Sequence, residues 1–232
     1  MKTLKIYFVL FLFTISSLAF AQTKSFDEEI APWHKKATMQ CGLLKAIPVN
    51  AEQILQNLIE LESELKVFTD KYLDNPPQEY ANDVNWKSYF QTLSENIVVV
   101  RERVEKKQFA QASIYCSIFC KTFGQMHKIN GTTDITDMIF SWRIELKNTA
   151  DMFNAGNTAG AEKNIGVVED IYNKILEIKV KRNDSSFNEL FKPLDEAFIG
   201  WLKSIKESNK KEMNISFKKF MDDFAKPYMA SF

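Results

Sequence analysis

The chain has 232 residues, of which 45% are hydrophobic and 26% charged, and its 30 basic side chains are balanced by 30 acidic ones. With only 7 Gly and 6 Pro, about half the usual share, the composition argues against a turn-rich all-β fold and against low-complexity disorder. The zero net charge, with a basic set of 26 Lys and 4 Arg, gives no electrostatic footprint for nucleic acid.

Residues 1–21 have the organisation of a secretory signal peptide. Lys2 and Lys5 precede a short apolar run, and the small residues Ala19 and Ala21 fit a cleavage site before Gln22. The apolar run is too short for a comfortable membrane span. We therefore expect a cleaved chain that is exported to the periplasm or secreted and has no membrane span; an uncleaved N-terminal anchor is the alternative.

The rest of the chain is predicted to be helical almost throughout. Apolar residues recur in alternating steps of four and three, which places them on one stripe of an α-helix. The first helix covers Phe26–Leu44, with Pro32 near its first turn, where proline is tolerated. Seven more follow in chain order, over residues 54–72, 86–104, 112–126, 135–153, 161–175, 187–205 and 213–224, the last ending before Pro227. No segment alternates with period two for long enough to compete as a strand.

The predicted helices repeat as hairpins. Trp86, Ile135 and Phe187 open three helix pairs at offsets of 49 and 52 residues, and the second helices recur at the same offsets. Two all-α architectures fit: two four-helix bundles over about 25–128 and 134–230, or one solenoid of stacked helix pairs. We favour the bundles, because the apolar stripes use bundle spacing and the loops are short.

No catalytic constellation stands out, so we expect the chain not to be an enzyme. It holds two histidines, and it has no Gly-rich phosphate loop, nucleophile elbow or paired-histidine zinc motif. The leading hypothesis is an exported, non-catalytic helical-bundle protein that acts as a binding or interaction module. Its partner is an unknown protein, or a small apolar ligand in a hydrophobic pocket within a bundle.

The alternative hypothesis is a soft-metal or haem protein. Cys116 and Cys120 lie one helical turn apart on the same stripe, and thiolates favour Cu(I). Residues 84–128 also resemble in architecture the last two helices of the cytochromes c-prime and b562, which implies haem as the cofactor. The covalent attachment motif Cys-x-x-Cys-His is nevertheless absent, because the cysteines have three residues between them and no adjacent histidine.

The cysteines suggest a specific pairing. If the first and fourth helices lie antiparallel and adjacent, residues level with one another have numbers that sum to about 154. Cys41 then comes within about 5 Å of Cys116 along the helix axis, and His34 comes level with Cys120. In an oxidising compartment this predicts a Cys41–Cys116 disulfide with Cys120 as a buried thiol. The competing outcome is a soft-metal site formed by Cys41, Cys116, Cys120 and His34.

Overall fold

The computed structural model describes residues 24–232, so the predicted signal peptide at 1–21 and its cleavage site lie outside the described part. All regular structure in the described range is helical, which confirms the predicted all-α fold. A single 3-10 turn, η1 (Gln78–Tyr80), separates the second and third helices. The α-helices are α1 (Phe26–Leu43), α2 (Ala51–Tyr72), α3 (Trp86–Glu105), α4 (Phe109–Asn130), α5 (Ile135–Asn154), α6 (Thr158–Arg182), α7 (Ser185–Lys206), α8 (Lys210–Asp223) and α9 (Ala225–Ser231).

Polar side chains and one glycine fix the helix ends that matter most for the arrangement. Ser25 and Glu28 form a capping box at the start of α1, and Asp134 and Asp137 form another at the start of α5. These boxes satisfy backbone N–H groups that have no partner within the helix. Gly131 ends α4 with a φ of +73°, a conformation that glycine adopts without a steric cost. The chain therefore turns sharply between α4 and α5.

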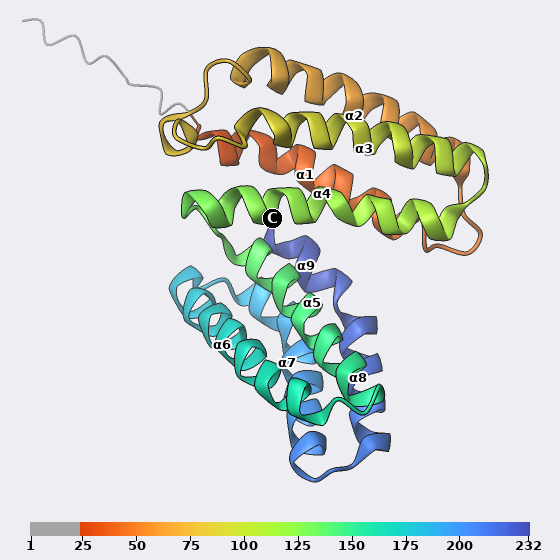
Figure 1. Cartoon of the computed structure of the whole chain (residues 1–232), viewed down its shortest axis with the longest axis vertical. Helices are drawn as coiled ribbons and strands as arrows, with labels where there is room; N and C mark the ends of the chain where they lie inside the picture. Colours follow the sequence, from red (N-terminus) through yellow and green to blue (C-terminus); the bar gives the residue numbers. More distant parts are fainter. Residues whose placement is uncertain (1–23) are drawn as a thin grey trace, which may run out of the picture.

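The first four helices form the upper half of the molecule in Figure 1. They share one buried apolar cluster. α1 contacts α2 and α4, and α3 contacts the same two helices, so the four close into one set. Trp33 of α1 is buried in this set, and its indole N–H donates to the Leu61 carbonyl at 2.9 Å. The ring of Trp33 lies edge-on to Phe119 of α4, with 5.8 Å between centroids. Such edge-to-face pairs add to the stabilisation that burial provides.

The remaining helices surround a second cluster, centred on Trp142 of α5. Its neighbours are aromatic side chains from α6, α7 and α8, with ring centroids 4.7 to 5.9 Å from that of Trp142: Tyr172, Phe191, Phe198 and Phe220. α5 packs mainly against α6, and α7 packs mainly against α8. Two of the predicted hairpins therefore pack together around Trp142. The two separate clusters are compatible with the predicted pair of bundles.

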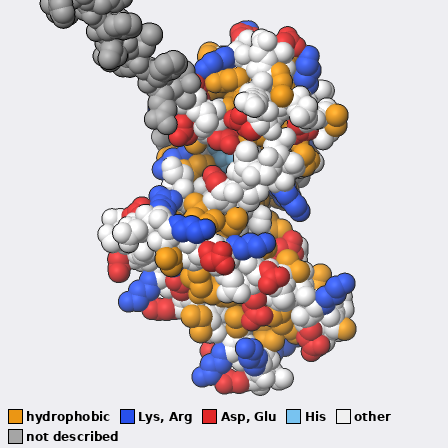
Figure 2. Space-filling view, turned by 90° about the vertical axis from the view of Figure 1, so that its left-hand side faces the viewer, with side chains coloured by type: hydrophobic (Ala, Val, Ile, Leu, Met, Phe, Trp, Pro, Cys, Tyr) orange, Lys and Arg blue, Asp and Glu red, His pale blue; other side chains and the backbone are white. Residues whose placement is uncertain are grey.

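The two halves meet where α4 passes into α5 and where α9 returns to the first half. Figure 1 shows the C-terminus beside α4, and the last residue, Phe232, lies edge-on to His34 of α1 with 4.8 Å between ring centroids. Figure 2 shows acidic and basic side chains interspersed over the face that it presents, in keeping with the balanced charge. Within residues 24–232, no helix has the length and apolar character needed to cross a membrane.

Two expectations about proline were wrong in detail. Pro32 lies in the second turn of α1 rather than near its start, which is tolerated because both Pro32 and Glu28, whose carbonyl loses its helical donor, are exposed. Pro227 does not follow the last helix; it is the third residue of α9, a helix that the apolar spacing did not reveal. A first-turn proline has no helical hydrogen bond to lose, so α9 can form around it.

Candidate functional site

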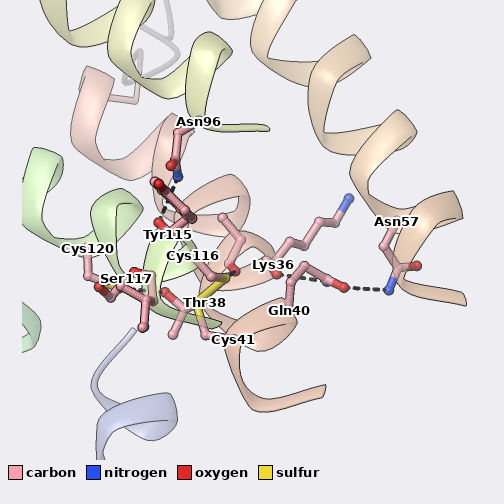
Figure 3. Close-up of a disulfide and its surroundings, with 12 residues drawn as sticks. Lys36, Thr38, Gln40, Cys41, Asn57, Asn96, Tyr115, Cys116, Ser117 and Cys120 are labelled. Carbon is pink, nitrogen blue, oxygen red and sulfur yellow. Dashed lines mark hydrogen bonds between the residues drawn. A yellow bond between two sulfur atoms is a disulfide. The ribbon is translucent and has the colours of Figure 1, made fainter. Parts of the chain in front are cut away.

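The structure pairs the cysteines that the helix register had brought together. Cys41 of α1 and Cys116 of α4 are joined in a disulfide, with 5.5 Å between their Cα atoms (Figure 3). The numbers of this pair sum to 157 rather than about 154, so α1 is displaced by roughly one turn from the predicted register. As a result Cys120 lies level with Thr38, whose hydroxyl is 3.3 Å from the sulfur, and not with His34.

Cys120 is a buried thiol that faces the second half of the molecule. It is 4% exposed, and it belongs to the apolar cluster of the second half although it lies on α4. Burial raises the pKa of the thiol, and the bond from Thr38 offsets that rise only in part. The thiolate, the form that attacks substrates and binds metals, is therefore disfavoured at neutral pH.

His34 lies among aromatic rings and away from the cysteines. Its imidazole stacks on Phe123 with 4.1 Å between centroids, and its Nε2 is buried without a hydrogen-bond partner. Burial, with a smaller contribution from the charge of His127, lowers the pKa of His34 to about 3. Among residues 24–232, no three His, Cys, Asp or Glu side chains are arranged to hold a metal ion. The soft-metal site of Cys41, Cys116, Cys120 and His34 is therefore not assembled here.

The second histidine forms a buried ionic cluster between the halves, which the sequence did not reveal. His127 Nδ1 lies 2.6 Å from Asp137 Oδ2 of α5, and its Nε2 lies 3.5 Å from Asp27 Oδ1 of α1. Burial alone would lower the pKa of His127, but bonding to Asp137 and Asp27 outweighs it and raises the pKa to about 10. Tyr80 donates to the same Asp27 oxygen at 2.6 Å. Because both ring nitrogens face carboxylates, His127 is poorly placed to bind a haem iron.

A cavity of about 400 Å³ lies between the two halves, bounded by α1 and α4 on one side and by α5, α8 and α9 on the other. We call it the joint cavity. Its size is within the range of small-molecule sites, about 300 to 1,000 Å³. The apolar part of its lining consists mostly of large flexible or aromatic side chains: Met39, Leu43, Phe140, Met221, Phe224 and Met229.

Polar groups enter the joint cavity from both halves. Thr38 and Cys120 come from the first half, and Tyr228 and Arg143 come from the second. The Tyr228 hydroxyl is buried near Thr38 and Cys120 but makes no hydrogen bond of good geometry. Arg143 has its guanidinium carbon 4.9 Å from the centroid of the Phe224 ring. An apolar wall with a few convergent polar groups is the usual composition of a ligand site.

Three larger hollows are less suited to a ligand; the smallest, of about 590 Å³, is lined by Asn50, Leu55, Ile59 and their polar neighbours on α2. The largest, of about 850 Å³, lies beside the start of α1 and is lined mainly by exposed residues such as Lys24 and Glu28. The third, of about 790 Å³, runs between α2 and α3, and the charge of its Lys66 is already paired with Asp70 at 2.8 Å. The joint cavity differs because its lining is largely apolar and comes from both halves.

No known protein family, curated protein or solved structure matches this chain. The candidate site therefore depends on the geometry of the described residues alone. Sequence reasoning missed Arg143, Tyr228 and a further lining residue, Lys45, which follows the end of α1. One signal could have pointed to the first: Arg143 is one of only four arginines in a lysine-rich chain, and it follows the core residue Trp142 directly.

Proposed function

We propose that the chain is an exported, non-catalytic binding protein whose ligand, small and largely apolar, occupies the joint cavity. The observation that carries the proposal is the cavity itself, because five helices from both halves line it and four of them supply large apolar side chains. A ligand held there would contact α1 and α9 at once. Binding would therefore strengthen the contact between the halves as well as bury apolar surface.

The state of the polar groups favours binding over catalysis. The thiol of Cys120 has a raised pKa, and the cavity lining contains no histidine or carboxylate that could activate it or the neighbouring hydroxyls as nucleophiles. His34 is stacked and neutral, and His127 is held between Asp137 and Asp27. Neither histidine lines the cavity. This arrangement supports a role in holding a ligand rather than in transforming it.

The test is titration with a neutral apolar fluorophore, N-phenyl-1-naphthylamine, whose emission rises on entering an apolar site. We expect saturable binding to the wild-type chain and loss of binding in Gly42→Phe and Ser117→Trp, which place bulk at the cavity lining. A Cβ at Gly42 meets no heavy atom within 4 Å, so the helix can accept the substitution.

Gly166→Phe is the matched control, because Gly166 is also helical with no heavy atom near its Cβ, but lies outside the cavity. Gly166→Phe should bind the fluorophore as the wild-type chain does. If wild type does not bind it, or if both cavity variants bind it as well as wild type, the proposed function is wrong.

A further inference from the structure

Arg143 carries a positive charge that the described residues leave uncompensated. The other three arginines have oxygen partners within hydrogen-bond distance: Glu62 for Arg101, Gln108 for Arg103, and Asp184 with two backbone carbonyls for Arg182. Within residues 24–232, Arg143 makes no ion pair or side-chain hydrogen bond, and its Nε is buried without a partner. A buried, unsatisfied charged donor is costly unless something else pairs with it.

A second cation lies at the same cavity. Lys45, just beyond the end of α1, also lines it, and like Arg143 it has no acidic partner in the described range. Although the Lys45 side chain is largely exposed, desolvation beside the cavity lowers its pKa, and the charge of Arg143 lowers it further. Burial lowers the pKa of Arg143 as well, with no carboxylate nearby to offset it. Two cations from different halves therefore face one cavity whose lining contains no carboxylate.

The rest of the lining indicates the other end of the ligand. Met39, Leu43, Phe140, Met221 and Met229 offer no hydrogen-bond donor or acceptor apart from weak sulfur contacts. Methionine is unbranched and adapts to irregular apolar shapes, as a flexible chain requires. A ligand that satisfies the whole cavity must combine an anionic group near Arg143 and Lys45 with an apolar body against these side chains.

Resting on the proposed function, we infer that the ligand of the joint cavity is an amphipathic organic anion of the fatty-acid type. Its head group pairs with Arg143 and Lys45, and its tail lies against the methionines and Phe140. The planar guanidinium suits a carboxylate, which it can hold with two parallel hydrogen bonds. Tyr228 is within the same lining, and its unpartnered hydroxyl can donate to the head group.

The test is displacement of bound N-phenyl-1-naphthylamine by two probes of equal tail length, dodecanoate and dodecanol, each below its micelle or solubility limit. We expect dodecanoate to displace the neutral fluorophore at a concentration about tenfold lower than dodecanol, as one charge-assisted hydrogen bond would give. In Arg143→Gln this ratio, with each probe measured against the variant's own affinity for the fluorophore, should fall toward one. Lys45→Gln, a change at an exposed residue, should lower the ratio to a smaller extent.

Arg103→Gln is the matched control, because Arg103 also lies over an aromatic ring, 5.8 Å from the Tyr115 centroid, and also has a buried Nε, but does not line the cavity. Its dodecanoate-to-dodecanol ratio should equal that of wild type. If the fluorophore binds but the two probes displace it equally, or if Arg143→Gln keeps the wild-type ratio, the ligand is not an anion held by Arg143, and the proposed function stands. Failure of the fluorophore to bind wild type overturns both proposals.

Discussion

His34 gives the sharpest test of the structure, because its environment predicts a pH effect of known sign. Replacing it by Phe keeps a flat ring to stack on Phe123 and to meet Phe232, and removes the buried Nε2 that has no hydrogen-bond partner. The substitution therefore preserves packing while it removes the titrating group. We expect His34→Phe to fold, and to differ from wild type chiefly in how its stability depends on pH.

The magnitude follows from the difference between the folded and unfolded pKa. Burial lowers the pKa of His34 from 6.5 to about 3, so the unfolded chain binds a proton below pH 6.5 that the folded chain does not bind. This costs the wild-type chain up to about 1.4 kcal/mol of unfolding free energy for each pH unit below 6.5, until the folded pKa is reached. At pH 5 the variant should therefore have gained about 2 kcal/mol on wild type relative to their difference at pH 7.5.

Urea unfolding followed by far-ultraviolet circular dichroism at pH 7.5 and pH 5 measures this difference. Comparing the two chains at each pH removes the contribution of the carboxylates, which both share. If the stability difference between variant and wild type is the same at both pH values, His34 titrates normally in the folded state. The stacked, solvent-free environment that we describe would then be wrong.

Other perturbations address the remaining features. Replacing Cys41 and Cys116 together by Ala should lower the unfolding free energy by about 4 kcal/mol, since the bridge closes a loop of 75 residues; a loss within experimental error would contradict the pairing. Phe198→Ala, at a fully buried ring, should cost about 3–5 kcal/mol in the same assay, whereas under about 1 kcal/mol would place that ring at the surface. Because the pKa of His127 is raised to about 10, its stabilisation is complete below pH 6.5 and is lost as the pH rises toward 10. The wild-type advantage over His127→Gln should therefore shrink by about 1.4 kcal/mol per unit between pH 7 and 9, and an unchanged advantage would reject the ion cluster. N-terminal sequencing of the exported chain should begin at Gln22, and retention of Met1 would refute cleavage.

The helices and the disulfide could be predicted because each depends on regularities that the sequence itself carries. Helical rise and an antiparallel pairing are enough to bring Cys41 near Cys116, although the register was in error by about one turn. That error mattered for His34, which lies opposite Phe123 and not opposite Cys120. A disulfide tolerates such an error because neighbouring turns present side chains on the same stripe, whereas a metal site needs several side chains to converge.

The joint cavity could not be predicted, because it depends on how one half is placed against the other. Phe140 and Arg143 reach it from α5, and Tyr228 reaches it from α9, a helix that the sequence analysis did not include. Apolar periodicity identifies the stripe that a helix buries within its own half. It does not identify the side chains that face across the gap between the halves.

Two groups of charged side chains lie between the halves, and they differ in whether the chain supplies a counter-charge. This contrast supports assigning the two groups different roles. Where α4 passes into α5, the charge of His127 is met by Asp137 and Asp27 within the chain, so this cluster needs nothing from outside and acts as part of the scaffold. At the joint cavity, Arg143 and Lys45 face a largely apolar space with no carboxylate in its lining. A chain with as many acidic as basic side chains had acids available to pair with them. The buried, unpartnered Nε of Arg143 lowers the stability of the folded chain unless an anion arrives, and that cost is the reason to expect one.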